Sequence, residues 1–79
     1  MMKISYDQEV DALYIRLVGN LQECRTVRLT DEITLNIGAA EQLVGIEILD
    51  AQQMIGQGAL PSVELENIAL ARHASIQPV

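Results

Sequence analysis

The sequence predicts an α+β fold: an antiparallel β-meander of about five strands followed by one or two short C-terminal helices. Apolar residues alternate with polar ones through most of the first fifty positions, which is the period of a half-buried strand. Short turn-like segments separate these runs, and short connections favour antiparallel neighbours because a parallel crossover needs a dozen or more residues. After position 49 the alternation gives way to helical spacing.

The 79 residues form a single predicted domain. Positions 1–50 make up the predicted sheet, 50–56 a short helix, and 57–79 a C-terminal extension of helix plus tail. A chain of this size buries only about 60% of the surface that its unfolded form exposes. We therefore expect self-association or a partner to complete a thin core.

Five runs carry the strand pattern. They are 3–6, 11–18, 23–29, 33–37 and 43–49. The fifth run has apolar residues at both odd and even positions, which indicates burial on both of its faces. We expect it to be a central strand or to lie beneath a helix.

The helical region is read from capping residues and spacing. Asp50 is predicted to cap the short helix, with Gln53 returning a reciprocal bond and Gly56 ending the helix. Apolar residues spaced three and four apart predict a second helix over 62–72. Positions 63–66 also alternate, so a sixth strand is the open alternative there.

The charge balance restricts the classes of partner. Eleven acidic against five basic residues give a net charge of −6, which disfavours direct binding to nucleic-acid phosphates. The same charge would attract a basic protein partner or cations; the alternative is that the acidic surface serves solubility. The single cysteine, Cys24, cannot form an internal disulfide, which favours a reducing cytoplasm. No run of about 18 apolar residues exists, so we expect no membrane insertion.

Glu47 is the acid that we single out for chemistry, because it lies between two isoleucines in the run expected to be most buried. A buried carboxylate is either paired or available as a general acid or base. The catalytic hypothesis adds Tyr14 and Arg16 on the same sheet face. The structural alternative is a cross-strand ion pair between Glu47 and Arg16 or Arg28.

Asp7, Glu9 and Asp11 form a D-x-E-x-D run like the start of a calcium-binding loop. Ala12 replaces the glycine at the sixth position of such a loop, and Val18 replaces the carboxylate at its twelfth. These three acids remain a candidate for weak cation binding. The alternative is that they solvate a turn, with Asp7 accepting a bond from its own backbone.

An aliphatic surface is the candidate interface. Its predicted members are Met54, Ile55, Leu60 and Val63. They either cover the sheet or mediate formation of a homo-oligomer, with a dimer as the expected form. One histidine and one cysteine cannot make a zinc site within one chain, and no glycine-rich phosphate loop is present, so we expect no cofactor.

Two segments resemble a known family. They are Lys3, Ile4, Ser5, Tyr6, Asp7, Glu9, Asp11, Ala12, Leu13, Tyr14, Ile15 and Leu17, and the stretch from Leu43 to Ala51. Together they are similar to the domain of unknown function 2283, a family of small prokaryotic proteins. The resemblance implies a compact β-rich domain, often self-associating and without an established activity; some members are similar in setting to antitoxins. Glu41 and Gln42 stand where the family tends to have Asp and Gly, so a looser hairpin is expected there.

The sequence therefore favours a small acidic cytoplasmic protein that acts as a homo-oligomeric interaction module. The sharper hypothesis is an antitoxin-like neutraliser of a basic protein. The alternatives are an acid/base enzyme that uses Glu47 and a weak cation-binding protein.

Overall fold

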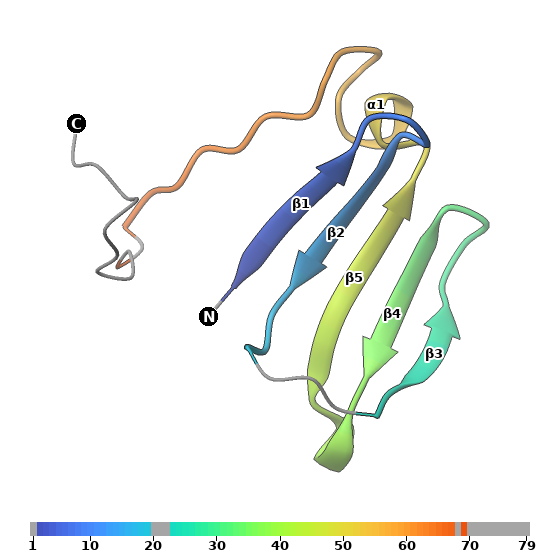
Figure 1. Ribbon diagram of the computed structural model, residues 1–79, viewed down its shortest axis with the longest axis vertical. Coiled ribbons are helices and arrows are strands. Elements are labelled where there is room, and N and C mark those ends of the chain that lie inside the picture. Colours follow the sequence, from blue (N-terminus) through green and yellow to red (C-terminus); the bar gives the residue numbers. More distant parts are fainter. Residues whose placement is uncertain (1, 20–22, 68, 70–79) are drawn as a thin grey trace.

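The computed structural model describes residues 2–19, 23–67 and 69, and these form a single antiparallel sheet with one short helix at its end (Figure 1). The strands are β1 (Lys3–Asp7), β2 (Ala12–Arg16), β3 (Arg25–Arg28), β4 (Ile33–Ile37) and β5 (Leu43–Leu49). A 3₁₀ turn, η1 (Ala39–Glu41), joins β4 to β5, and α1 (Ala51–Met54) follows β5. The predicted five-stranded antiparallel sheet is confirmed.

The order of the strands corrects the predicted meander. It is β1-β2-β5-β4-β3, so β5 lies between β2 and β4, while β3 is at an edge. The central position that the sequence predicts for β5 is confirmed. The connection over 17–24 can span about 25 Å when extended, against about 14 Å for the three strand spacings between β2 and β3. The connection is therefore long enough to cross the positions of β5 and β4. This leaves β2 free to pair with β5, the strand that has two apolar faces.

One face of the sheet is aliphatic, because residues opposite each other in an antiparallel ladder share a face. Its middle row crosses all five strands as Ile4, Ile15, Ile46, Leu35 and Val27. The next row is Tyr6, Leu13, Ile48 and Ile33. We call this surface the aliphatic face.

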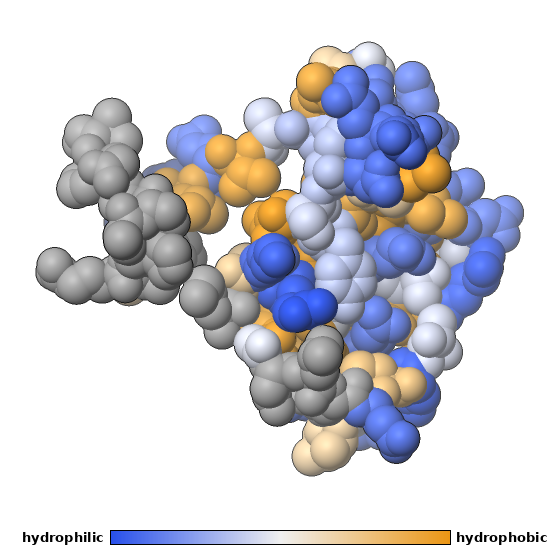
Figure 2. Space-filling view, in the orientation of Figure 1, coloured by the Kyte–Doolittle hydropathy of each residue, from blue (hydrophilic) through white to orange (hydrophobic). Residues whose placement is uncertain are grey.

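The opposite surface is the polar face. Its rows are Lys3, Arg16, Gly45, Asn36 and Thr26, and then Ser5, Tyr14, Glu47, Thr34 and Arg28. Figure 2 looks onto this side and shows hydrophilic side chains spread across the strands.

The aliphatic face is incompletely buried. The buried apolar residues of the described chain are Leu13, Val44 and Ala51. In the middle row Ile4 is exposed and the other four side chains are only half-buried. Over the described ranges, no second sheet is present to cover this face, and the helical segments are the four residues of α1 and the three of η1. The sheet is thus one layer of a fold that normally needs two.

The helix beyond α1 is a wrong prediction over the described positions. Residues 62–67 and 69 have neither helical nor strand structure, and the rest of the predicted 62–72 helix lies outside the described residues. Val63 and Leu65 are more than half exposed, so their side chains have little of the burial that could stabilise a helix. Residues 63–66 are described without strand structure, so the alternative of a sixth strand there is not formed either.

Asp50 occupies the predicted N-cap position of α1, but the side-chain bond predicted for it is not formed. Its backbone is left-handed (φ 53°). The carboxylate of Asp11, in the β1–β2 turn, accepts the Gln52 backbone N–H instead, at 3.2 and 3.3 Å. The Ala51 N–H donates to the Asp11 carbonyl at 3.0 Å. A residue distant in sequence therefore caps the helix and fixes it against the first hairpin.

Candidate functional site

The Glu47 cluster lies in the centre of the polar face. Glu47 on β5 is directly opposite Tyr14 on β2 and Thr34 on β4. All three are half-buried, as is Arg16, which lies one row away. The sequence hypothesis that Glu47, Tyr14 and Arg16 share a face is therefore confirmed.

Gly45 allows the Tyr14 ring to lie across β5. A Cβ atom at Gly45 would be 2.1 Å from the Tyr14 Oη and 2.6 Å from its Cζ, so only glycine leaves space for the ring. In this position the Tyr14 hydroxyl accepts a hydrogen bond of 2.9 Å from Asn36 Nδ2 on β4. The tyrosine thus links three strands.

The predicted ion pair of Glu47 is wrong. Within the described part of the chain, the one salt bridge joins Arg25 to Glu41, between β3 and the η1 turn. Arg28 is separated from Glu47 by Thr34 in the same row. A half-buried position lets water solvate the carboxylate, which removes the need for a paired arginine.

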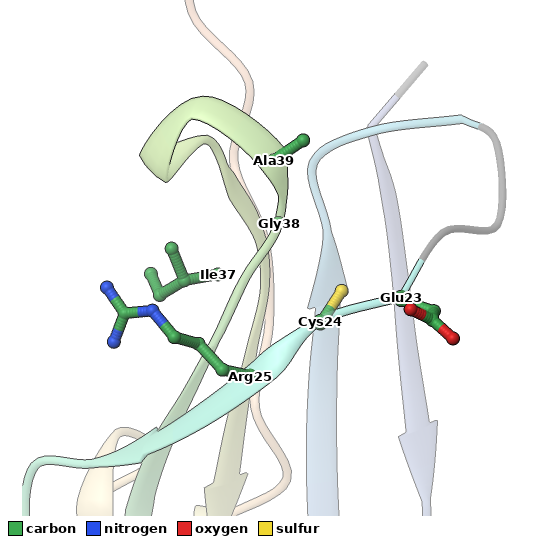
Figure 3. A pocket seen from close by; sticks show the side chains of 6 residues that line it. All are labelled: Glu23, Cys24, Arg25, Ile37, Gly38 and Ala39. Carbon is green, nitrogen blue, oxygen red and sulfur yellow. The ribbon is translucent and has the colours of Figure 1, made fainter.

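A shallow depression lies at the opposite end of the sheet from α1. Its volume is about 510 Å³, and Figure 3 shows it between the start of β3 and the end of β4. The lining residues are Glu23, Cys24, Arg25, Ile37, Gly38 and Ala39. Glu47, Tyr14 and Arg16 are not among them, so this depression does not provide a substrate cleft for the predicted acid/base group.

The three acids of the first hairpin have separate roles. The Asp7 carboxylate accepts the Glu9 backbone N–H at 3.0 Å, as the turn hypothesis predicts, and Asp11 is used as the cap of α1. Across residues 2–19, 23–67 and 69, no three His, Cys, Asp or Glu side chains are grouped so that they could hold a metal ion. The described geometry gives no support to the cation site.

Asp11 also binds a tyrosine. The Tyr6 hydroxyl donates to Asp11 Oδ1 at 2.6 Å and accepts from Gln52 Nε2 at 3.1 Å. The hydrogen bond to Asp11 raises the pKa of Tyr6, with smaller contributions from nearby negative charge. This Tyr6–Asp11–Gln52 cluster was missed from the sequence, because Gln52 is more than forty positions from the other two residues.

The acidic turns gather at one end of the sheet. Since β1, β5 and β3 run in the same direction, the segments that follow them lie together (Figure 1). The Leu49 N–H donates to the Glu32 carbonyl at 2.8 Å, which ties the β3–β4 turn to the end of β5. We call this region the acidic end; its carboxylates belong to Asp7, Glu9, Asp11, Asp31, Glu32 and Asp50.

The predicted interface residues are all exposed. Met54 and Ile55 lie at the end of α1, and Leu60 and Val63 lie in the segment that follows, with exposed fractions between 40% and 57%. Their role in assembly stays a prediction. The aliphatic face is a larger apolar surface. The sequence shows which side of each strand is apolar, but the face could not be predicted without the order of the strands.

Comparison with known proteins gives the family. The sequence pattern of the family described as protein of unknown function (DUF2283) matches residues 3–52. The chain belongs to the DUF2283 family. In this DUF2283 protein the matched region contains all five strands and the first residues of α1. No curated protein and no solved structure matches the chain.

The family match ends at residue 52, within α1. The described residues 53–67 and 69 therefore lie outside the DUF2283 pattern. Among the described residues, no helix is long and apolar enough to cross a membrane.

Proposed function

We propose that this DUF2283 protein is a homo-oligomeric interaction module whose subunits pack together through their aliphatic faces. The observation that carries the proposal is the middle row of that face, in which none of the five aliphatic side chains is buried. Sheets in stable domains bury one face against another layer, and stacked sheets about 10 Å apart are a common solution. A second copy supplies such a layer.

Two substitutions at adjacent positions of β4 test this proposal. Leu35 lies on the aliphatic face and Thr34 on the polar face. We expect Leu35→Lys to convert the oligomer to monomer, because a buried unpaired ammonium is strongly unfavourable, while Thr34→Lys leaves the assembly intact. Sedimentation equilibrium gives the oligomeric state, and circular dichroism checks that the sheet is retained. A wild-type chain that stays monomeric at high concentration would reject the proposal.

Binding of a basic protein is the second candidate function. The acidic end favours it, because six carboxylates lie on three neighbouring turns there and Arg28 is the nearby cation at the end of β3. Such a surface attracts a positively charged partner and speeds its association. This would correspond to the antitoxin-like role that the family resemblance implies.

The test compares the two ends of the sheet. A partner is first recovered with the tagged protein from its native host, and its affinity for the purified chain is measured over a range of salt concentrations. Asp31→Asn with Glu32→Gln should weaken binding, while Glu23→Gln at the opposite end should not. Affinity that is independent of salt and of these substitutions would exclude the acidic end as the binding surface.

A further inference from the structure

The extended segment over 62–66, which we call the arm, has the pattern of a strand that lacks a sheet. Val63 and Leu65 are apolar, Glu64 and Glu66 are acidic, and they alternate. The arm has no secondary structure, and the exposed fractions of Val63 and Leu65 are 57% and 54%. Figure 1 shows it leaving α1 and descending on the β1 side of the sheet. It therefore presents a period-two surface without a partner layer.

The edge strand β3 offers backbone groups to such a segment. The Leu29 N–H points toward β4, because it donates to the Ile33 carbonyl at 2.8 Å. Backbone groups of alternate residues point to opposite sides of a strand. The N–H and C=O groups of Thr26 and Arg28 therefore point outward from the sheet, where the strand order places no other strand of the described chain.

We propose that the arm of one chain pairs as an added antiparallel strand with β3 of a second copy. One register matches polarity and charge at every position: Glu64 opposite Arg28, Leu65 opposite Val27, and Glu66 opposite Thr26. Leu65 then extends the middle row of the aliphatic face, and Glu64 forms a cross-strand ion pair with Arg28 on the polar face. The inference rests on the proposed face-to-face dimer.

The symmetry of that dimer brings the arm to β3 of the partner. A two-fold axis parallel to the strands places β1 of one subunit behind β3 of the other and keeps the strand directions. The arm descends beside β1, whereas β3 ascends in the view of Figure 1, so the two segments meet antiparallel.

The same geometry argues against pairing of the arm with β3 of its own chain. Within one chain β1 and β3 are opposite edges of the sheet, separated by about 19 Å. The charges also favour β3, which has Arg25 and Arg28 and no acid, over β1, which contains both Lys3 and Asp7. A reciprocal exchange of arms would close both β3 edges of the dimer.

Disulfide trapping between two full-length variants tests the exchange. Val27→Cys and Leu65→Cys are made separately in a Cys24→Ser background, mixed so that subunits exchange, and oxidised. In the proposed register these residues form a non-hydrogen-bonded pair, whose Cα separation of about 4.5 Å suits a disulfide. We expect a cross-linked heterodimer to form at least about tenfold faster than with Val27→Cys and Ser62→Cys, a pair that is out of register. Equal rates, or no cross-link, would overturn the proposal.

A charge exchange provides the second measurement. Arg28→Glu should weaken dimerisation about tenfold, since each dimer contains two such pairs, and adding Glu64→Arg should restore most of the affinity. If Leu35→Lys abolishes the dimer but Arg28→Glu leaves it unchanged, the pairing of the arm with β3 is rejected and the face-to-face dimer is retained. A wild-type chain that remains monomeric would reject both.

Discussion

A single residue, Asp11, connects the first hairpin to α1 at one end of this sheet. Asp11 accepts bonds from Tyr6 and from the backbone of Gln52, so one carboxylate joins the first hairpin to α1. The sequence contained the residue types but not the pairing. Asp50 was the expected cap because it is adjacent to the helix. It has a left-handed backbone, and its side chain makes no cap bond to the first turn.

The Tyr6–Asp11 bond predicts a pH dependence. Ionisation of Tyr6 would remove the donor and place a second negative charge beside Asp11, so its pKa is raised in the folded chain. The stabilisation is therefore complete below the ordinary tyrosine pKa and is lost as the pH rises through the higher folded value. In a Tyr14→Phe background, Tyr6 is the sole tyrosine, and tyrosinate absorbance follows it. Asp11→Asn should lower the pH at which half of Tyr6 is ionised. An unchanged value would contradict the hydrogen bond to Asp11 as the cause of the raised pKa.

Gly45 predicts a coupling with Tyr14. Gly45→Ala should destabilise the chain by about 1–3 kcal/mol, because the new Cβ overlaps the tyrosine ring and displaces it from Asn36. In a Tyr14→Ala background the same substitution should cost much less, although Ile15 O at 3.2 Å keeps some crowding. Urea unfolding of the four proteins of this cycle measures the coupling. Additive effects would show that the ring does not impose the glycine.

At the scale of elements, the sequence predicted the ranges of the strands better than the order in which they pair. Ile33–Ile37 and Leu43–Leu49 match their predicted ranges, because alternation is a local property of the chain. The order β1-β2-β5-β4-β3 is not local: it depends on a connection long enough to bypass two strands and on the two-sided apolar character of β5. Over its described positions, 62–67 and 69, the predicted second helix is not formed for a related reason, because helical spacing stabilises a helix only where a surface receives its apolar side.

The η1 turn predicts a stabilising substitution. Ala40 and Glu41 have left-handed backbones, with φ of 55° and 59°. A residue with a Cβ costs roughly 1–2 kcal/mol in this region, and glycine avoids most of that cost. Ala40→Gly should therefore raise the free energy of unfolding by about 0.5–1 kcal/mol, while Ala39→Gly, which lacks a positive φ, should not. Thermal unfolding of the two variants decides this, and a lower midpoint for Ala40→Gly would contradict it.

At the scale of the whole molecule, the sequence pointed to self-association only through the small core that a chain of this size can bury. Small size and a thin core predicted that the chain associates with itself, but the predicted interface was the exposed segment around Met54, Ile55, Leu60 and Val63. The described fold offers the aliphatic face, which all five strands build from their apolar positions and which is incompletely buried among the described residues. Where that face lies depends on the pairing of β5 with both halves of the sheet.

An open aliphatic face predicts that folding and association are coupled. If the second layer comes from another copy, the dimer is stabilised by mass action, and each tenfold rise in protein concentration adds about 1.4 kcal/mol to the free energy of unfolding per dimer. The urea midpoint should therefore rise with concentration in the wild-type chain and in Thr34→Lys, and become independent of it in Leu35→Lys. A wild-type midpoint that is constant over a hundredfold range would mean that the single sheet is stable alone, and the aliphatic face would then need another explanation than self-assembly.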